Sequence, residues 1–417
     1  MKLLRHVSAM KYIVYCFCLM LICTSCKKES LSNIAKAGSA NNIRLTNNGL
    51  VFIMKDRHPG TIYALDANSG AVKWQYANDS DVESFSSSPC VANDILFTGV
   101  TSYGTEASPG FKTLLCAFVA RTGRMLWVTV LNNALTSLSN PTFENGVVYI
   151  AAEKRLFAVN AADGQINWKM TVDSGSSDNE LCSPTVVNGT IYIGNKKHLF
   201  ALNAADGSQK WQRNADLSFS SPTVAEGIVT FVDRNDGSIK AYDTSGNPQW
   251  RFNKAGYLVG STTTNGNFVY QGIGYPFDTL NSFALQCSTG AVKWNYAQAI
   301  ENTVDNSTCG DPFYYNNTLY VALRDSLFAI STTGAHNKKW SYFTGAPTDN
   351  SFSPSSPVAG NGIVYVMTVP KVLYALNEIT GALIWQFNVG GDYPRYSPVI
   401  LYNDSTAIHP TGSGMTQ

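Results

Sequence analysis

Charged side chains are scarce in this chain, and neither sign dominates. Only 14% of the 417 residues are Asp, Glu, Lys or Arg, with 30 basic and 29 acidic residues. Residues 1–26 hold three of the basic residues and no acid, so the remainder has 27 basic and 29 acidic residues, a net charge of −2. A nucleic-acid partner requires a basic surface, and this balance argues against one.

The sequence also lacks the motifs of common catalytic and cofactor sites. Its five histidines are scattered, and none stands at a zinc-binding spacing from Cys or Glu. There is no Gly-x-Ser-x-Gly elbow, no phosphate-binding loop and no Cys-x-x-Cys-His haem motif. Residues 233–237 begin like a calcium loop, but Thr244 stands at the twelfth position, where such a loop has Glu, which favours a polar turn. We therefore expect no enzyme activity, no cofactor and no metal.

Cysteine is concentrated in the first 26 residues and rare afterwards. Four of the nine cysteines lie there, which leaves five for the rest of the chain. An odd number leaves at least one thiol unpaired in an oxidising compartment. Cys90 and Cys116 fall on the first and third strands of one repeat, about 9–10 Å apart at the usual strand spacing, which exceeds the ~7 Å Cα limit for a disulfide. We expect buried, mostly unpaired thiols.

Long hydrophobic runs are absent apart from Tyr12–Ile22, which follows basic residues near the N-terminus. This run is too short to cross a bilayer comfortably and is typical of a signal peptide. The segment Cys23-Thr24-Ser25-Cys26 resembles a bacterial lipoprotein cleavage box, with Cys23 where Leu is usual, and predicts lipidation of Cys26. We interpret residues 1–26 as a lipoprotein signal peptide and 27–40 as a flexible tether. A plain secretory signal is the alternative, and either Met1 or Met10 is the start.

What the chain has in abundance is a repeat, shown most clearly by residues 181–211. Thr185–Val187, Thr190–Gly194, His198–Leu202 and Ser208–Trp211 read as four short strands, a to d, because they are rich in β-branched and aromatic residues. Asn188-Gly189 between strands a and b is the dipeptide of a type I′ hairpin, which needs positive φ at both residues. Such a sheet is apolar on both faces and is buried only by stacking against its copies.

The eight tryptophans of the chain mark eight such units, and each is predicted to close strand d. They stand 39 to 53 residues apart, the period of a propeller blade, and seven of them follow a Gly by four residues; Gly334 to Trp340 is two residues longer, which predicts a bulged turn. The eight residues are Trp74, Trp127, Trp168, Trp211, Trp250, Trp294, Trp340 and Trp385. The sequence predicts an all-β, eight-bladed propeller of four-stranded antiparallel blades over 41–409, with a tail at 410–417. An open solenoid or a pair of sandwiches is the alternative.

The start of each unit predicts how the ring closes. Six units open with a residue followed by Pro, as in Ser183-Pro184, and Pro suits the first residue of a strand. The first unit lacks this opening, which reappears at the C-terminus as Ser397-Pro398. We therefore expect Ser397–Leu401 to join blade 1 and close the ring, although Ile43–Thr46 is a second candidate for the inner strand.

The pattern Leu199–Trp211, LFALNAADGSQKW, resembles the quinoprotein propeller repeat, as do Ile62–Trp74 and Leu373–Trp385. In that family the Trp-bearing motif locks neighbouring blades together, so it implies a structural role and no quinone. The quinone-dependent dehydrogenases of the family are longer and add calcium ligands, a catalytic Asp and often adjacent cysteines. With its lipoprotein box and no such site, the chain is more similar to the lipoprotein propeller subunit of the outer-membrane β-barrel assembly machinery. That resemblance implies a lipid-anchored scaffold that faces the periplasm from the outer membrane.

Loop length and charge predict which face of the propeller carries the binding function. Antiparallel strands place the short a–b and c–d turns on one face and the longer b–c and d–a links on the other, and variable loops commonly carry function. The d–a links are acidic and the b–c links are basic, which suggests a protein- or peptide-binding face, although ordinary polar loops are the simpler explanation. The candidate residues are Asp79, Asp81, Glu83, Asp178, Glu180, Arg155, Lys197, Arg234 and Arg324.

The sequence thus favours a monomeric, membrane-anchored, non-enzymatic scaffold that binds other envelope proteins. A propeller that binds a polysaccharide or small ligand is the first alternative, in which Tyr103, Tyr275, Phe277 and Tyr393 would stack on sugars. A quinone-dependent dehydrogenase is the second. The partner or ligand itself cannot be named from the sequence.

Overall fold

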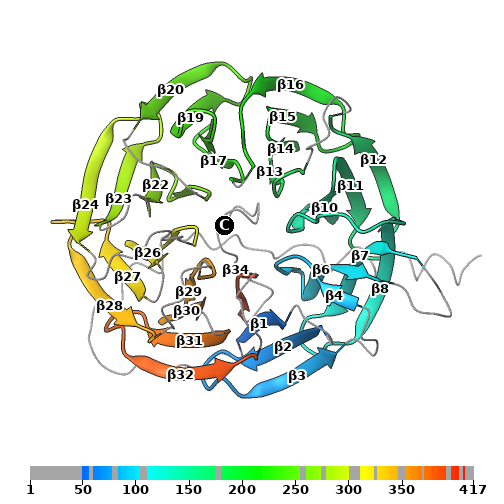
Figure 1. Cartoon of the computed structure of the whole chain (residues 1–417), viewed down its shortest axis with the longest axis horizontal. Helices are drawn as coiled ribbons and strands as arrows, with labels where there is room; N and C mark the ends of the chain where they lie inside the picture. The colour runs from blue at the N-terminus through cyan, green and yellow to red at the C-terminus, as the bar shows by residue number, and fades with distance from the viewer. Residues whose placement is uncertain are drawn as a thin grey trace, which may run out of the picture. The chain divides into compact units, whose positions relative to one another are not determined.

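Eight antiparallel sheets follow one another along the chain, and each corresponds to one unit of the repeat. In the computed structural model, Figure 1 shows them arranged as the blades of a propeller, which confirms the predicted fold. The described residues are 49–55, 60–77, 83–103, 110–173, 180–218, 220–253, 260–273, 279–299, 310–323, 326–345, 354–368, 371–390, 396–402 and 407–408. The predicted signal peptide, tether and Cys26 lie outside this range.

Each blade has four strands in the order a to d, counted outward. Blades 2 to 4 consist of β5 (Cys90–Ala92), β6 (Ile95–Ser102), β7 (Lys112–Val119) and β8 (Met125–Asn132); β9 (Thr142–Glu144), β10 (Val147–Ala152), β11 (Arg155–Asn160) and β12 (Ile166–Thr171); and β13 (Thr185–Val187), β14 (Thr190–Gly194), β15 (His198–Asn203) and β16 (Gln209–Asn214).

The second half of the ring repeats this order. Blades 5 to 8 consist of β17 (Thr223–Ala225), β18 (Ile228–Asp233), β19 (Ser238–Asp243) and β20 (Pro248–Asn253); β21 (Thr263–Thr264), β22 (Phe268–Ile273), β23 (Thr279–Gln286) and β24 (Val292–Ala299); β25 (Phe313–Tyr315), β26 (Thr318–Leu323), β27 (Ser326–Ser331) and β28 (Lys338–Phe343); and β29 (Val358–Gly360), β30 (Ile363–Thr368), β31 (Val372–Asn377) and β32 (Leu383–Asn388). Figure 1 places the d strands at the rim.

Blade 1 closes the ring with the C-terminal strand, as the sequence predicts. Its strands β1 (Leu50–Lys55), β2 (Thr61–Asp66) and β3 (Val72–Ala77) are completed by β33 (Val399–Leu401), which pairs antiparallel with β1. The rival inner segment, 43–46, lies outside the described residues. Blades 1 and 2 each carry a fifth strand that the repeat did not predict: β34 (Ala407–Ile408) pairs with β33, and β4 (Glu83–Phe85) pairs with β6.

The a–b turns of blades 3 and 4 have positive φ at both central residues, as the predicted type I′ geometry requires. Asn188 and Gly189 have φ of 51° and 69°, and Asn145 and Gly146 have φ of 50° and 82°. The end of strand d differs from the prediction, because Trp211 lies inside β16 and the strand continues to Asn214. The strand is longer because β15 remains available for pairing beyond Trp211, as far as His198 opposite Asn214.

Neighbouring blades are joined by the tryptophans that mark the repeat. The indole N–H of Trp168 donates a hydrogen bond of 3.1 Å to the carbonyl oxygen of Ala204 in the next blade. Six other indoles make the equivalent bond: Trp74, Trp127, Trp211, Trp250, Trp340 and Trp385, the last to Ala67 across the ring closure. These contacts join different blades, as a locking role requires.

A glycine of the next blade lies flat against the same indole. A Cβ added to Gly123 would stand 2.6 Å from a ring carbon of Trp74, and Gly164 is equally close to Trp127. Blade 7 is the exception, because a Cβ on Gly334 meets nothing within 4 Å and the His336 ring stacks on Trp294 instead, with centroids 5.2 Å apart. This is the blade whose c–d turn has two extra residues, and the longer turn carries His336 onto the indole.

A second set of contacts runs around the inner strands through the residue that precedes proline, or through Ser261 in blade 6, which has no proline at this position. The backbone N–H of Ser88 donates to the Asn140 side chain at 2.8 Å, Asn140 to Ser183 at 3.0 Å, and Ser397 back to Ser88 at 3.1 Å. Four more links of this kind join Ser221, Ser261, Asp311, Ser356 and Ser397 in order. The Ser-Pro opening therefore supplies an acceptor to the neighbouring blade as well as a proline at the strand start.

The apolar core lies between the blades, because strands b and c are buried on both faces. β14 is buried at every position, whereas β16 at the rim alternates between exposed and covered residues. Cys90 and Cys116 are buried on β5 and β7 with β6 between them, and neither forms a disulfide, as expected. In the described part of the chain, no helix is long and apolar enough to cross a membrane.

The indole–glycine contact predicts a specific loss of stability. Gly123→Ala places a methyl group against Trp74 in addition to straining a residue with φ of 71°, and we expect a loss of about 2–4 kcal/mol. Gly189→Ala has nearly the same φ, 69°, but no atom within 4 Å of the new Cβ, and should cost only about 1–2 kcal/mol. Urea unfolding of both variants measures the difference. Equal losses would show that the contact does not stabilise the ring.

Asp311 predicts a pH dependence, because it is the one carboxyl in the ring of pre-proline side chains. Burial raises the pKa of Asp311 to about 6, although hydrogen bonds from Ser261 oppose the rise. The folded protein then holds this proton when the unfolded chain has lost it, so stability falls as pH rises from about 4 to about 6. Asp311→Ser retains an acceptor and should stabilise the protein at pH 7 by about 1–3 kcal/mol.

Denaturant midpoints between pH 4 and pH 7 provide the measurement. The difference between Asp311→Ser and the native protein should shrink towards pH 4, whereas Asn140→Ser, at the equivalent position of blade 3, should shift the midpoint equally at every pH. A constant difference for Asp311→Ser would contradict the assignment.

Candidate functional site

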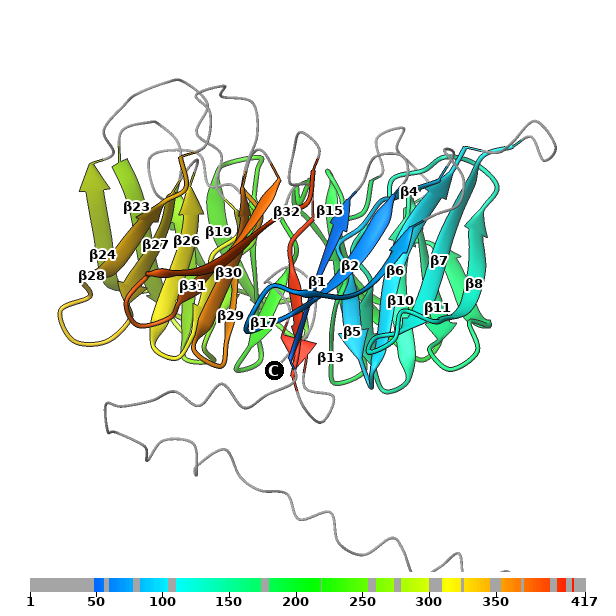
Figure 2. The same ribbon diagram turned by 90° about the horizontal axis from the view of Figure 1, so that it is seen from below.

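The strand directions place the b–c and d–a links on the same face of the propeller, as predicted. In Figure 2 the arrowhead of β24 points upward, so this face is uppermost and the tight a–b and c–d turns lie below. Of the candidate residues, Asp79, Asp81, Asp178 and Arg324 lie outside the described residues. The others are placed as follows.

Lys197 and Arg234 are exposed in the b–c turns of blades 4 and 5, and Glu180 is exposed in the link that leads to blade 4. Arg155 is partly buried as the first residue of β11, and Glu83 lies on β4; both are therefore in strands and not in the predicted loops. The pairing of β4 with β6 places Glu83 on a strand, opposite Ser102.

The acidic and basic links are bound to each other through the backbone. In the link between blades 4 and 5, the Ala215 N–H donates to Lys197 O at 2.9 Å, and Leu217 N–H donates to Asn195 O at 2.8 Å. The same link meets the next blade, because Arg234 N–H donates to Asp216 O at 2.9 Å. The link therefore fixes Lys197 and Arg234 on a common, ordered stretch of this face.

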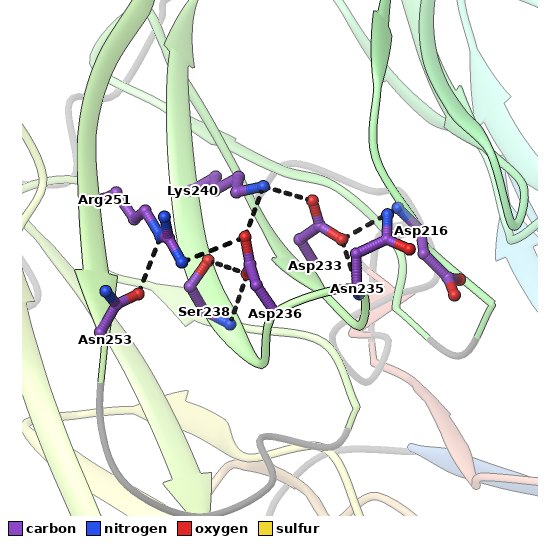
Figure 3. Close-up of polar contacts among 8 residues, drawn as sticks. All are labelled: Asp216, Asp233, Asn235, Asp236, Ser238, Lys240, Arg251 and Asn253. Carbon is purple, nitrogen blue, oxygen red and sulfur yellow. Dashed lines mark hydrogen bonds and ion pairs between the residues drawn. The ribbon is translucent and has the colours of Figure 1, made fainter.

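Blade 5 holds the most developed charged cluster of this face (Figure 3). Asp233, at the end of β18, is 1% exposed, and its carboxylate receives Lys240 Nζ at 2.5 Å and the Asp216 N–H at 3.0 Å. Lys240 also lies 2.9 Å from Asp236, which Arg251 approaches at 3.2 Å. Two carboxylates and two cations thus neutralise each other across β18, β19 and β20.

The cations control the ionisation of this cluster. Burial alone would favour neutral forms, but hydrogen bonds from Ser238 and Lys240 outweigh it and hold the pKa of the Asp236 carboxyl below its ordinary value. Hydrogen bonds to Asp233 and Asp236 likewise outweigh burial and raise the pKa of Lys240. Asp236 and Lys240 therefore stay charged near neutral pH, and their ion pair adds rigidity to this part of blade 5.

A smaller polar group lies on the same face of blade 4. His198 Nδ1 is 3.2 Å from Asp173, and the Asn195 side-chain amide donates to the same carboxylate at 3.1 Å. Asn195 in turn accepts the N–H groups of Lys197 and His198 at 2.8 Å each. These contacts hold the b–c turn that carries Lys197.

The described residues offer few features of a catalytic or sugar-binding site. Among them, no three His, Cys, Asp or Glu side chains lie close enough to hold a metal ion. Asp233 and Asp236, the start of the calcium-like sequence, bind Lys240 instead. Of the four aromatic residues considered for sugar stacking, only Tyr103 is described, and it is 44% exposed in an edge contact with Phe111.

The charged cluster of blade 5 escaped the sequence analysis because two of its members lie on strands. Lys240 occupies the position of β19 where strand c of blades 1 and 4 has Tyr63 and Phe200, and Arg251 is the first residue after Trp250. The sequence did contain a signal for this cluster. Lys240 replaces the aromatic residue of the repeat and stands close to Asp233 and Asp236.

Comparison with known proteins shows which family the chain resembles. A family model described as outer membrane protein assembly factor BamB matches residues 58–218, 158–303 and 297–407. The BamB of Yersinia pestis is 35% identical over 117 residues, which are 28% of each protein. The crystal structure of BamB from Moraxella catarrhalis superposes with a TM-score of 0.56 at 15% identity and covers 76% of this chain and 91% of that one.

An enzyme also shares the repeat. The tetrathionate hydrolase of Acidithiobacillus ferrooxidans is 22% identical over 346 residues, or 82% of this chain. The chain spans about half of that enzyme, 52% of its length. The three overlapping matches of the family model, by contrast, extend from residue 58 to residue 407 and include blades 2 to 8 and the part of blade 1 that follows β1. The chain therefore belongs to the family of outer membrane protein assembly factor BamB, as an eight-bladed propeller with quinoprotein-type repeats.

Proposed function

We propose that this protein is a non-enzymatic, lipid-anchored scaffold that binds other proteins of the cell envelope and acts in outer-membrane protein assembly. The observation that carries the proposal is the BamB family match over residues 58–407. The self-neutralised cluster of Asp233, Asp236, Lys240 and Arg251 supports it, because it makes a rigid support for exposed groups and leaves no reactive one.

The binding face consists of the b–c and d–a links. Exposed Lys197 and Arg234 lie on neighbouring blades that one link holds in register, and this provides a fixed pair of cations for an acidic partner surface. Since loops on a rigid ring keep their geometry on binding, the interaction loses little conformational entropy.

Membrane attachment depends in this proposal on Cys26. Acylation of this residue gives stable anchoring when two or more chains are attached. Cys26→Ser should move the protein from the membrane fraction to the soluble fraction, and Cys23→Ser, in the same box, should leave it with the membrane. Fractionation with labelled palmitate measures both. Retention of Cys26→Ser in the membrane would contradict lipidation at this residue.

Affinity capture from detergent-solubilised envelope, followed by mass spectrometry, tests the scaffold role. We expect a stoichiometric envelope protein to co-purify, and the double variant Lys197→Glu, Arg234→Glu to reduce its capture roughly tenfold, because two favourable charge pairs become repulsive. The control is Lys293→Glu, Lys338→Glu, at two exposed lysines near the opposite face.

Two outcomes would count against the proposal. If the protein is recovered alone, the scaffold role fails, and the same preparation is then assayed for tetrathionate hydrolysis and for bound quinone by absorbance. If both double variants capture the partner equally well, the binding face is elsewhere on the ring.

A further inference from the structure

The outer strand of blade 2 differs in chemistry from that of every other blade. The first residue after the repeat tryptophan is Val128 here, and it is Gln, Lys, Arg, Asn or Ser in the other seven blades. In blade 2 the third residue after the tryptophan, Trp127, is Val130, and the residue before Trp127 is Leu126. Val128 and Val130 are 44% and 46% exposed. The two exposed valines form an apolar stripe. At the same two positions of the other outer strands, the one exposed large apolar residue among the described residues is Phe343 of blade 7.

This strand is also an unprotected edge. β8 is the last strand of its sheet and pairs with β7 on one side only among the described strands. The outer side of an edge strand presents backbone N–H and C=O groups to any strand that approaches it. Proteins usually guard such edges with charged residues or proline, and residues 125–132, MLWVTVLN, contain neither. At eight residues, β8 is longer than the six-residue outer strands of blades 1, 3, 4, 5, 7 and 8.

The side chains of β8 specify what an added strand must carry. Val130 and Val128 pair with Leu114 and Cys116 of β7, which belong to the core between blades 1 and 2, so the apolar stripe extends that core. Trp127 and Thr129 point the other way, and the Thr129 hydroxyl donates to Gly164 O in blade 3. A strand beside β8 would therefore place every second residue on the apolar stripe and the residues between on a more polar surface.

A cation at each end of the β8 edge sets the charge that a bound strand must carry. Arg124 immediately precedes β8. At the other end of β8, Asn132 pairs with Thr113, and Lys112 is the residue before Thr113 on β7. Both are exposed, and no carboxylate lies within ion-pair distance of either in the described part of the chain. An occupant with an acidic residue at each end of its apolar segment complements both cations.

The geometry points to the outer edge of blade 2 as a site that binds, by strand addition, an extended segment of a partner protein. This segment alternates apolar and polar residues and has acidic flanks. This site is separate from the loop face that would hold the assembly partner in the proposed function.

Synthetic peptides test the site directly with the full-length protein. The probe has about ten residues that alternate Val or Leu with Ser or Thr, with Glu at each end. A control peptide of the same composition has its apolar residues in one block. Fluorescence anisotropy measures affinity, and amide hydrogen exchange identifies the strand that becomes protected. We expect the alternating peptide to bind at least tenfold more tightly than the control and to protect β8.

Variants of the edge complete the test. Val128→Lys with Val130→Lys should weaken binding of the alternating peptide by about tenfold or more, because two charges replace the apolar stripe. Gln75→Lys with Ala77→Lys, at the same two positions of blade 1, should have no effect. Val128→Thr with Val130→Thr retains β propensity and provides a milder variant if the lysines disturb folding; it should weaken binding less.

Several results would overturn the inference. Equal binding of both peptides, unchanged affinity in all blade 2 variants, or protection of a strand other than β8 would each remove the site. Protection of β8 that depends on protein concentration and not on peptide would show that a second copy occupies the edge. The lysine variant should still capture the assembly partner in the experiment above, so loss of peptide binding and failure of the scaffold role are distinguishable.

Discussion

The contact between each repeat tryptophan and the next blade is the constraint on which this structure depends. At seven of the eight junctions between blades the indole donates a hydrogen bond to a backbone carbonyl and a glycine lies against its ring, and at the eighth His336 stacks on Trp294. The separation of two blades is therefore set at the rim. A four-stranded sheet with two apolar faces is not stable alone, and its burial requires a neighbour at a fixed distance. Because Trp385 makes the same contact with Ala67, the first and last blades are held like any other pair.

The inner ring of hydrogen bonds complements this contact near the axis. Side chains at the start of the inner strands, such as those of Asn140 and Ser183, accept an N–H from the preceding blade and so satisfy a backbone donor near the short inner strand. Asp311 substitutes a carboxylate for a hydroxyl in this series, and its raised pKa follows from burial. Neighbouring blades are therefore joined by tryptophan contacts at the rim and by polar side chains near the axis. Both sets continue across the ring closure, the first from Trp385 to Ala67 and the second through Ser397.

This rigid ring separates two kinds of surface. On the loop face, ion pairs join the charged groups of blade 5, and backbone hydrogen bonds order the turns that carry the exposed Lys197 and Arg234. At the rim of blade 2, a polar strand is replaced by an apolar edge. A scaffold that uses the first surface for an assembly partner and the second for an extended segment would hold the two on one rigid body.

The sequence by itself determined the fold, because each of its signals is local. The eight tryptophans, the glycine four residues before seven of them, the Asn-Gly turns and the return of Ser-Pro at residue 397 predict the blade count, the turn type and the closing strand, and the strands bear these out. Hairpins report their geometry within a few residues, and a repeat displays its period along the chain. The position of Trp211 within β16 was missed because strand length depends on its partner.

Only the tertiary structure decided what the side chains meet. Asp233, Lys240 and Arg251 lie on three strands of blade 5. Their ion pairs form because these strands pair side by side, which cannot be read from the individual residues. The same holds for Ser88 and Ser397, which are 309 residues apart and joined by one hydrogen bond. Loop charge could be listed from the sequence, but which charges remain exposed, as Lys197 and Arg234 do, is set by packing between blades, since distances across the ring are not encoded in spacing along the chain.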